Sequence, residues 1–466
     1  MKINIGQKEI IHFIGMGGIG MSGLAQIMKI MGFKVQGSDT NINKNIENCK
    51  KLGIKFFLGQ KKKNIKDATI FVKSSAIKKN NPEIIEAKRK KKPIYERVEM
   101  LSNIVSLKKN IIISGSHGKT TTTSLVSKIL LESKLDPTII NGGVINSIKN
   151  NAKLGKGEWA VLEADESDGS FLKLPINYSI VTNIDKEHID FYKNYKNLEN
   201  CFVKFINKTP PIGKCLICID DKNIKKLKKK IKTKNILTYG FSLNSDYQII
   251  RPKYNIKNCK FDLIVKNFLG KKIIIKNIVL NLIGKHNILN SVAAISVCLN
   301  LGIKIKIIKK ALSKFTGVQR RMTKIFEKNE NEFYDDYAHH PTEIYSVLEG
   351  IKKVANNKKI TSVFQPHRFS RVNSLKNEFS KSFKFSDRVM LCPVYAAGEK
   401  KIKNFDIIKF GRMISLNSNV DVILVKDEEN LKNYFKKNLI KNEIIIGMGA
   451  GTISNWIRNL KQILWI

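Results

Sequence analysis

The sequence predicts an α/β protein built from three domains. Its 466 residues are about three times the length of an average domain. Apolar runs with the character of strands lead three times into glycine-rich turns, at residues 15–20, 115–118 and 449–451. Strand and helix patterns alternate between these turns, which is typical of α/β domains with largely parallel sheets.

We expect a Rossmann-like first domain at residues 1–107, a central α/β domain of the P-loop type at residues 108–316, and a Rossmann-like α/β domain at residues 317–466. Each contains several apolar runs of strand length. The expected strands are IIHFI and FKVQG in the first domain, residues 111–114, 159–165 and 179–185 in the second, and residues 333–337, 360–365, 388–394 and 443–447 in the third. A helix is expected over residues 284–300.

The chain is strongly basic, with 84 Lys and Arg residues against 39 Asp and Glu, a formal net charge of +45. Such an excess is common in proteins that bind nucleic acids or membrane surfaces. Here the lysines are spread along the chain among many Ile and Asn residues, and no zinc-finger, RRM or zipper pattern accompanies them. We therefore interpret the charge as a compositional bias and expect no specific nucleic-acid partner.

The cysteines and one apolar segment provide evidence on the cellular compartment of the protein. The seven cysteines are scattered, and the pair Cys215 and Cys218 has no second pair to complete a metal site, so core positions in a reducing cytoplasm are the simpler interpretation. Residues 10–28 are uncharged and long enough to span a membrane, but their five glycines favour a strand–loop–helix turn. We expect a cytoplasmic protein without a membrane span, as a monomer or a homodimer.

The strongest local signal is GSHGKTTTT, which follows the apolar strand IIIS. Glycines let the backbone wrap around phosphates, and the N–H groups that open the following helix attract the anion. The Lys119 ammonium is suited to neutralise the terminal phosphates and the Thr120 hydroxyl to bind Mg²⁺. The loop is shorter than the usual phosphate loop, but its setting favours a nucleoside triphosphate site. Its expected residues are Gly115, Ser116, His117, Gly118, Lys119, Thr120 and Thr121.

Two acidic motifs follow the next strands. EADESDGSF begins at Glu163, a position where an acidic Mg²⁺ ligand often lies in nucleotide sites, and the chain has few acids to place in an ordinary loop. NIDKEHID contains Asp185 and His188. A single histidine after a strand is more often structural, so its role here depends on the two neighbouring motifs. We expect an Mg²⁺ site made of Thr120, Glu163 and His188.

The first glycine loop, GMGGIG, contains Gly15, Gly17, Gly18 and Gly20, and Asp39 follows 19 residues after the last of them. This spacing fits the dinucleotide fingerprint. The same loop would also hold the pyrophosphate of another nucleotide, such as a UDP-sugar, and the loop alone leaves NAD and a UDP-sugar open. Nothing in the rest of the chain supplies a site for hydride transfer.

The third domain contributes DDYAHHPTE (335–343) and FQPHRFSR (364–371). The first places two carboxylates and two imidazoles directly after a strand. In the second, Arg368 and Arg371 are three residues apart and could clamp a carboxylate. A surface ion-pair network is the alternative. Six of the seven histidines lie in these motifs or in GKHNILN, which favours function.

These segments, together with VTNID, the Arg pair at 320–321 and VYAAGE, resemble the Mur ligases in order and over nearly the whole chain. The resemblance implies an ATP- and Mg²⁺-dependent ligase. Its first domain would bind a UDP-sugar, its central domain ATP, and its third domain the amino acid and part of the nucleotide. The member that the chain resembles most joins L-alanine to UDP-N-acetylmuramate through an acyl phosphate, in the synthesis of peptidoglycan precursors.

The resemblance also implies residue roles. Catalysis would depend on Lys119, Glu163, His188 and, as acceptor of the ammonium proton, His339. Besides the phosphate loop, ATP would contact His286, Asn287, Asn290, Arg321, Asp335 and Asp336. The UDP-sugar would contact Gly15, Gly17, Gly18, Gly20, Asp39, Ser74 and Ser75. The amino-acid and lactyl carboxylates would contact Tyr337, His339, Arg368 and Arg371.

The sequence departs from the family pattern at a few positions. Ala338 stands where the closest members have glycine, which favours the related ligase that attaches a recycled tripeptide to the same sugar nucleotide. Ser167, in place of a bulkier aromatic residue, favours the alanine enzyme. Several relatives carry a carbamylated lysine where Val203 lies in this chain, so none is expected here.

The sequence leaves open two other classes of function. An NAD-dependent oxidoreductase would be supported by GMGGIG with Asp39. A basic nucleic-acid-binding ATPase would be supported by the charge and the phosphate loop.

Overall fold

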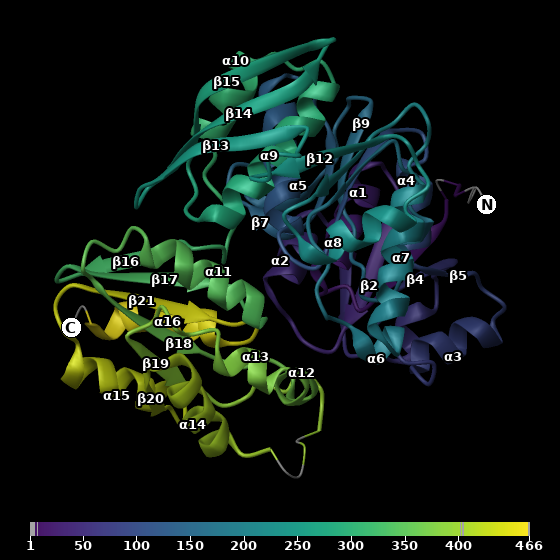
Figure 1. Cartoon of the computed structure of the whole chain (residues 1–466). Coiled ribbons are helices and arrows are strands. Elements are labelled where there is room, and N and C mark those ends of the chain that lie inside the picture. Colours follow the sequence, from purple (N-terminus) through teal and green to yellow (C-terminus); the bar gives the residue numbers. More distant parts are fainter. Residues whose placement is uncertain (1–4, 7, 401, 403–404, 465–466) are drawn as a thin grey trace. The chain divides into compact units, whose positions relative to one another are not determined.

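The computed structural model describes residues 5–6, 8–400, 402 and 405–464. The chain forms two compact units (Figure 1). The first consists of residues 1–252, 261–280 and 289–316, and the second of residues 253–260, 281–288 and 317–466.

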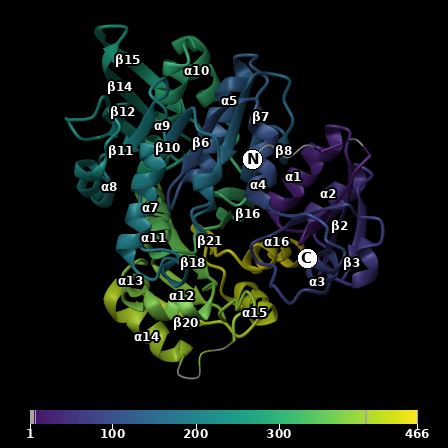
Figure 2. The ribbon, with the colours of Figure 1, turned by 90° about the vertical axis from the view of Figure 1, so that its right-hand side faces the viewer.

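The first unit contains a five-stranded sheet in the order β3-β2-β1-β4-β5, in which all neighbouring strands are parallel. This is the strand order of a Rossmann fold. Figure 2 shows strands β2 and β3 of this sheet, with helices α1, α2 and α3, in purple and blue. The strands are β1 (Ile10–Ile14), β2 (Lys34–Asp39), β3 (Lys55–Leu58), β4 (Ile70–Lys73) and β5 (Ile94–Glu96), and the helices are α1 (Ile19–Ile30), α2 (Lys44–Lys51), η1 (Lys62–Ile65), α3 (Pro82–Arg89) and α4 (Arg97–Val105).

The central sheet has ten strands in the order β15-β14-β13-β12-β11-β10-β6-β9-β7-β8. Its middle strands are parallel and fully buried, which explains their continuous Ile and Val runs. The strands are β6 (Lys109–Ser114), β7 (Thr138–Ile145), β8 (Asn150–Lys153), β9 (Trp159–Glu163), β10 (Tyr178–Val181), β11 (Cys215–Cys218), β12 (Ile236–Gly240), β13 (Tyr247–Tyr254), β14 (Cys259–Phe268) and β15 (Lys271–Leu280). The helices are α5 (Lys119–Glu132), η2 (Ser170–Lys173), α6 (Ile189–Tyr192), α7 (Tyr195–Asn207), α8 (Lys222–Leu227), η3 (Lys228–Lys230), α9 (Lys285–Asn300) and α10 (Ile305–Ser313).

Helix α1 connects the two sheets of the first unit by packing on the hairpin β7–β8. The amide of Asn151 donates to the carbonyl oxygen of Ile19 at 2.8 Å, and the amide of Asn150 donates to Gln26 at 2.9 Å. A Cβ atom at Gly23 would lie 2.8 Å from the Asn151 amide nitrogen. Part of the glycine-rich segment therefore serves close packing of this helix.

The second unit is built on a six-stranded sheet in the order β16-β17-β21-β18-β19-β20, in which only β16 and β17 pair antiparallel. Two separate buried clusters cover its two faces. One contains residues of α11, α13 and α14, and the other contains residues of α15 and α16. The strands are β16 (Thr323–Lys328), β17 (Asn331–Asp336), β18 (Lys359–Phe364), β19 (Arg388–Leu391), β20 (Asp421–Leu424) and β21 (Glu443–Met448). The helices are α11 (Pro341–Lys352), α12 (Phe369–Ser374), α13 (Lys376–Ser380), α14 (Ile407–Ser418), α15 (Glu428–Asn438) and α16 (Ile453–Leu464).

The predicted α/β fold is confirmed, and every expected strand is present within a few residues of its expected bounds. Cys215 and Cys218 lie in the buried strand β11, as expected, and all seven cysteines are free thiols. Among the residues that the structure describes, no helix combines the length and the apolar character needed to cross a bilayer.

Candidate active site

The phosphate loop lies between β6 and α5 and depends on two glycines in left-handed backbone conformations. Gly115 has φ 133° and Gly118 has φ 82°. A Cβ atom at Gly115 would overlap the hydroxyl of Thr182, and one at Gly118 would lie 2.5 Å from the side-chain oxygen of Asn290. Larger residues are therefore excluded at both positions, and the loop delivers the chain directly into the N-terminus of α5 at Lys119.

The Lys119 ammonium lies at the centre of this loop. Its Nζ is 2.7 Å from the carboxylate of Glu166, and it also donates to the carbonyl oxygens of Gly115 and Ser116. Burial alone would lower the pKa of Lys119, but the carboxylates of Glu166 and Asp165 outweigh it and hold this pKa above its usual range. Lys119 therefore carries a full positive charge at neutral pH. Burial raises the pKa of Glu166 and the adjacent Lys119 ammonium opposes this shift, and at 2.7 Å the two groups form an ion pair.

Thr120 and Glu163, two of the three predicted Mg²⁺ ligands, lie side by side. The Thr120 hydroxyl donates to Glu163 Oε1 at 3.0 Å, and the backbone N–H of Gly142 in β7 donates to Glu163 Oε2 at 2.6 Å. A Cβ atom at Gly142 would lie 2.5 Å from Glu163 Oε1. A hydroxyl and a carboxylate in contact provide the hard oxygen ligands that Mg²⁺ prefers, so these residues fit the ion.

The third predicted ligand, His188, belongs to a different cluster. Side-chain atoms of Asp165, Glu166 and His188 all lie within 4.8 Å of one another, and Nε2 of His188 is 3.7 Å from Oε1 of Glu166. His188 itself has φ 55° and caps α6. The structure thus pairs Thr120 with Glu163 and places His188 with two carboxylates that the sequence analysis did not assign to the metal.

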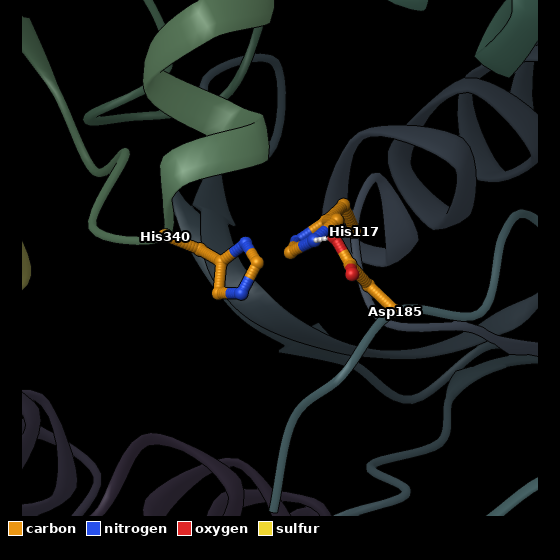
Figure 3. Close-up of side chains that lie close together, drawn as sticks. All are labelled: His117, Asp185 and His340. Atoms are coloured by element: carbon orange, nitrogen blue, oxygen red, sulfur yellow. Dashed lines mark hydrogen bonds and ion pairs between the residues drawn. The ribbon is translucent and has the colours of Figure 1, made fainter. Parts of the chain in front are cut away.

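His117 and Asp185, from two separate motifs, form an imidazole–carboxylate pair. Nε2 of His117 is 3.1 Å from Oδ2 of Asp185, as Figure 3 shows, and the backbone N–H of Asp185 donates to the Ser116 hydroxyl at 2.8 Å. Figure 3 also draws His340, which belongs to the second unit and caps α11. The NID motif after β10 therefore holds the phosphate loop in place.

The first glycine loop connects β1 to α1 and is held by β2. Gly15, with φ 82°, donates its N–H to the carbonyl oxygen of Ser38 at 2.9 Å. The carboxylate of Asp39 accepts the N–H of Gly17 at 2.8 Å, and Gly18 caps α1. The predicted acidic residue thus stabilises the loop in this structure.

A pocket of about 320 Å³ lies between the two sheets of the first unit. Ser75, a predicted sugar-nucleotide contact, lines it together with the cationic side chains of Lys73, Arg97 and Lys173. A Cβ atom at Gly20 would lie 3.3 Å from the Arg97 guanidinium, so this glycine gives the arginine room beside α1. Glu96 and Asp168 also line the pocket. Lys73 pairs with Glu96 at 2.6 Å and Lys173 with Glu99 at 2.8 Å, so an anionic ligand would compete with these carboxylates.

The two carboxylates of the DDY motif are buried at the end of β17. Asp335 accepts the Ser454 hydroxyl at 2.6 Å and the Arg458 guanidinium at 3.0 Å. Asp336 accepts backbone N–H groups, among them that of Ala338 at 2.8 Å. Burial raises the pKa of Asp336 to about 6.

Tyr337 lies against two guanidinium groups. The centre of its ring is 4.8 Å from Cζ of Arg320 and 5.2 Å from Cζ of Arg321. Glu343, on α11, lies 3.7 Å from Arg321 and 3.4 Å from Nδ1 of His339. These contacts gather the predicted residues of DDYAHHPTE around one turn.

His367 connects Arg371 to this group, and its ring lies 5.7 Å from that of His339. Its ring stacks on Tyr395 with 5.6 Å between centroids, and Nη1 of Arg371 lies 3.2 Å from its Nδ1. Burial, together with the neighbouring charges of His339 and Arg371, lowers the pKa of His367 to about 3, so the imidazole is neutral and accepts from Arg371. Arg368 is exposed and has φ 68°.

The predicted ATP contacts in the segment GKHNILN fall in both units. Asn290 lies against Gly118 in the first unit. In the second unit Asn287 donates its amide to the carbonyl oxygen of Ile283 at 2.7 Å. His286 is the third, and burial lowers its pKa to about 4, so its imidazole is neutral.

Several residues at these sites were not predicted from the sequence. Glu166 was visible in EADESDGSF, but its contact with Lys119 was not. Gly142 and Arg97 belong to no recognisable motif, and their places depend on long-range packing that a local pattern does not contain.

Comparison with known proteins identifies the relatives of this chain. Three family models match consecutive stretches, namely the catalytic domain of the Mur ligase family at residues 10–109, the Mur ligase middle domain at 113–298, and the glutamate ligase domain of Mur ligases at 320–451. The UDP-N-acetylmuramate–L-alanine ligase of Pelagibacter ubique is 56% identical over 100% of both chains. The ligase of the same name from Brucella anthropi is 40% identical over 98% of this chain and 97% of its own.

Solved structures agree with these relatives. The UDP-N-acetylmuramate-alanine ligase of Thermotoga maritima superposes with a TM-score of 0.83 at 28% identity, over 98% of this chain and 99% of its own. A murein peptide ligase from Psychrobacter arcticus shares the fold, with a TM-score of 0.71 at 20% identity over 98% of each chain. Together, the three family models and the full-length relatives show that the chain belongs to the Mur ligase family.

Proposed function

We propose that this chain is an ATP-dependent ligase that joins L-alanine to UDP-N-acetylmuramate in peptidoglycan precursor synthesis. The observation that carries the proposal is the 56% identity over the full length of a UDP-N-acetylmuramate–L-alanine ligase. The geometry supports it, because a glycine loop, a buried charged lysine and a hydroxyl–carboxylate pair lie together, as phosphoryl transfer requires. Free thiols at all seven cysteines suit the cytoplasm, where we place the protein.

The reaction must activate a carboxylate, which is a poor electrophile at neutral pH. The lactyl carboxylate of the sugar would attack the γ-phosphorus of ATP, and ADP would leave. The neutral amine of L-alanine would then attack the acyl phosphate, and inorganic phosphate would leave. The chain mainly positions these groups and offsets their charge, with Lys119 beside the terminal phosphates.

Mg²⁺ would be held by Thr120 and Glu163, whose contacting oxygens lie 3.0 Å apart. When bound, the ion supplies positive charge to the phosphates. His188, with Asp165 and Glu166, is a second group of suitable ligand atoms in the same unit. The Gly142 N–H holds the Glu163 carboxylate in place, so its remaining lone pairs stay available.

The sugar nucleotide would occupy the pocket lined by Ser75, Arg97 and Lys173 and the neighbouring glycine loop. The cations suit its diphosphate. Gly15, Gly17, Gly18, Gly20 and Ser74 would shape the loop around it, and Asp39 would stabilise that loop by its bond to the N–H of Gly17.

The second unit would bind the amino acid and accept its ammonium proton. His339 Nδ1 is 2.9 Å from the carbonyl oxygen of Tyr337, so Nδ1 carries the proton and Nε2 keeps a lone pair. His339 would therefore accept the ammonium proton at Nε2. Arg371 would bind a carboxylate.

The main alternative is a murein peptide ligase, which Ala338 favours and which shares the fold. Phosphate release distinguishes the two, measured with ATP, UDP-N-acetylmuramate and each of L-alanine, glycine, L-serine and the cell-wall tripeptide in turn. The proposal requires turnover that is fastest with L-alanine. Turnover with the tripeptide alone would assign the chain to the alternative.

Arg371→Ala is expected to damage ligation more than nucleotide binding. The side chain lies in the second unit, bonded to His367, and has none of the phosphate-loop contacts. Removing a bidentate guanidinium from a carboxylate costs about 100-fold in kcat/KM, and ATP affinity should change less than twofold. Calorimetric ATP binding and steady-state ligation test this. An equal loss in both would move Arg371 to the nucleotide site.

The basic charge is expected to have no part in the reaction. The net charge of +45 will attract polyanions by counterion release, with an affinity that falls steeply as salt rises. Ligation should depend far less on salt, because its charges meet in a partly desolvated site. Duplex DNA and structured RNA, added at physiological salt, should leave alanine ligation unchanged. ATP turnover that requires nucleic acid in place of the sugar nucleotide would contradict this interpretation.

A further inference from the structure

The proposed mechanism does not use the contact between the Glu166 carboxylate and the Lys119 ammonium, which is separate from the place of Glu166 beside Asp165 and His188. Its side chain is 1% exposed and lies 2.7 Å from the ammonium. An ammonium has three N–H donors, and the other acceptors of Lys119 are the carbonyl oxygens of Gly115 and Ser116. The chain therefore surrounds its own catalytic lysine with two carbonyl acceptors and one carboxylate at ion-pair distance.

Glu166 is held firmly in this position. Its backbone carbonyl oxygen accepts the N–H of Gly169 at 3.1 Å and the hydroxyl of Tyr192. Its Oε1 is buried and receives no hydrogen bond from the residues that the structure describes, and His188 at 3.7 Å is beyond hydrogen-bonding distance. If Lys119 were withdrawn, the carboxylate would be left with the longer contact to the His188 imidazole, 3.7 Å from Oε1.

A nucleotide phosphate that approaches Lys119 must therefore meet this carboxylate. Either the phosphate displaces Glu166 from the ammonium, which leaves a buried charge unpaired, or two anions share one cation in a site with little water. Both raise the free energy of the complex, since charges a few ångströms apart interact strongly where water is excluded. The penalty grows with the charge on the terminal phosphate.

We propose that Glu166 acts as a resident anion that occupies Lys119 in the empty site and competes with the terminal phosphate of the nucleotide. It weakens binding of ATP and ADP and so helps ADP to leave after the reaction. This inference rests on the proposed ATP site. Glu166 is a positioning residue for Lys119, and its charge sets nucleotide affinity.

The test is calorimetric binding of AMP, ADP and ATP to the full chain in EDTA, which removes any effect through a metal. Glu166→Gln keeps the shape and removes the charge, and it should bind ATP about tenfold tighter. ADP should gain less, and AMP, which lacks the terminal phosphates, should not change. Glu166→Asp keeps the charge and should stay close to the parent. Glu132→Gln, which changes a partly buried carboxylate at the far end of the same helix as Lys119, is the matched control.

Several outcomes would overturn the proposal. Unchanged or weaker ATP binding in Glu166→Gln would show that the carboxylate does not compete, and tightening by Glu166→Asp equal to that by Glu166→Gln would show that charge is not the cause. If Glu166→Gln melts too early to measure, Glu166→Ala must show the same tightening. Lys119→Ala distinguishes a failure of this inference from a failure of the proposed ATP site. Lost ATP binding there with no change in Glu166→Gln contradicts only this inference, whereas no change in either variant contradicts the ATP site itself.

Discussion

Lys119→Ala is expected to reduce ligation by about a thousandfold or more, because it removes the buried cation that donates to the carbonyl oxygens of Gly115 and Ser116 in the phosphate loop. The loss should appear in kcat as well as in kcat/KM, since the charge is needed most as the γ-phosphoryl group transfers. Phosphate release with saturating substrates measures it. Lys128→Ala, on the same helix and paired with Glu132, should stay within twofold of the parent.

The same substitution carries a stability cost that the sequence did not reveal. Without Lys119 the buried Glu166 carboxylate loses its cation, and breaking a buried pair costs about 3 kcal/mol. The double variant Lys119→Ala/Glu166→Gln removes both charges and should melt closer to the parent while remaining inactive. Activity that returned with stability in the double variant would show that Lys119 has only a structural role.

Most of the fold followed from local sequence patterns. A buried parallel strand carries a continuous apolar run, and a strand that ends in a glycine turn before a helix is recognisable in one dimension. For this reason β1, β6 and β21 and the turns after them lay where they were expected. The hairpin β7–β8 and the outer strands β13, β14 and β15 were not expected, because their residues are partly exposed and their runs are interrupted by lysine and asparagine.

The site was predictable only as separate motifs. Each motif follows a strand, and the carboxyl ends of parallel strands meet at one edge of a sheet, so the closeness of Thr120 and Glu163 could be expected. The pairing of Glu166 with Lys119 could not, because it depends on the path of the chain after β9. Likewise, the place of Arg97 beside Gly20 results from the packing of two helices far apart in sequence.

Glu163→Gln is the second variant with a large expected effect. It should separate the role of the metal from that of the phosphate loop. The amide can keep both contacts, because its oxygen can accept the Gly142 N–H while its NH2 donates to the Thr120 hydroxyl, so the fold and the loop should persist. It loses the negative charge that Mg²⁺ requires of a strong ligand. We expect kcat to fall by about 100-fold at millimolar Mg²⁺, with partial recovery as Mg²⁺ is raised.

The measurement is a magnesium titration of ligation for Glu163→Gln beside Glu158→Gln, which changes an exposed carboxylate just before the same strand. Glu158 is bonded to Lys109, outside the phosphate loop, so its titration curve should match that of the parent. The curve for Glu163→Gln should shift to higher Mg²⁺ while ATP binding in EDTA stays within twofold. A fall in activity with an unshifted midpoint would mean that Glu163 does not hold the ion. The Gly142 N–H and the Thr120 hydroxyl would then serve only to hold this carboxylate in the fold.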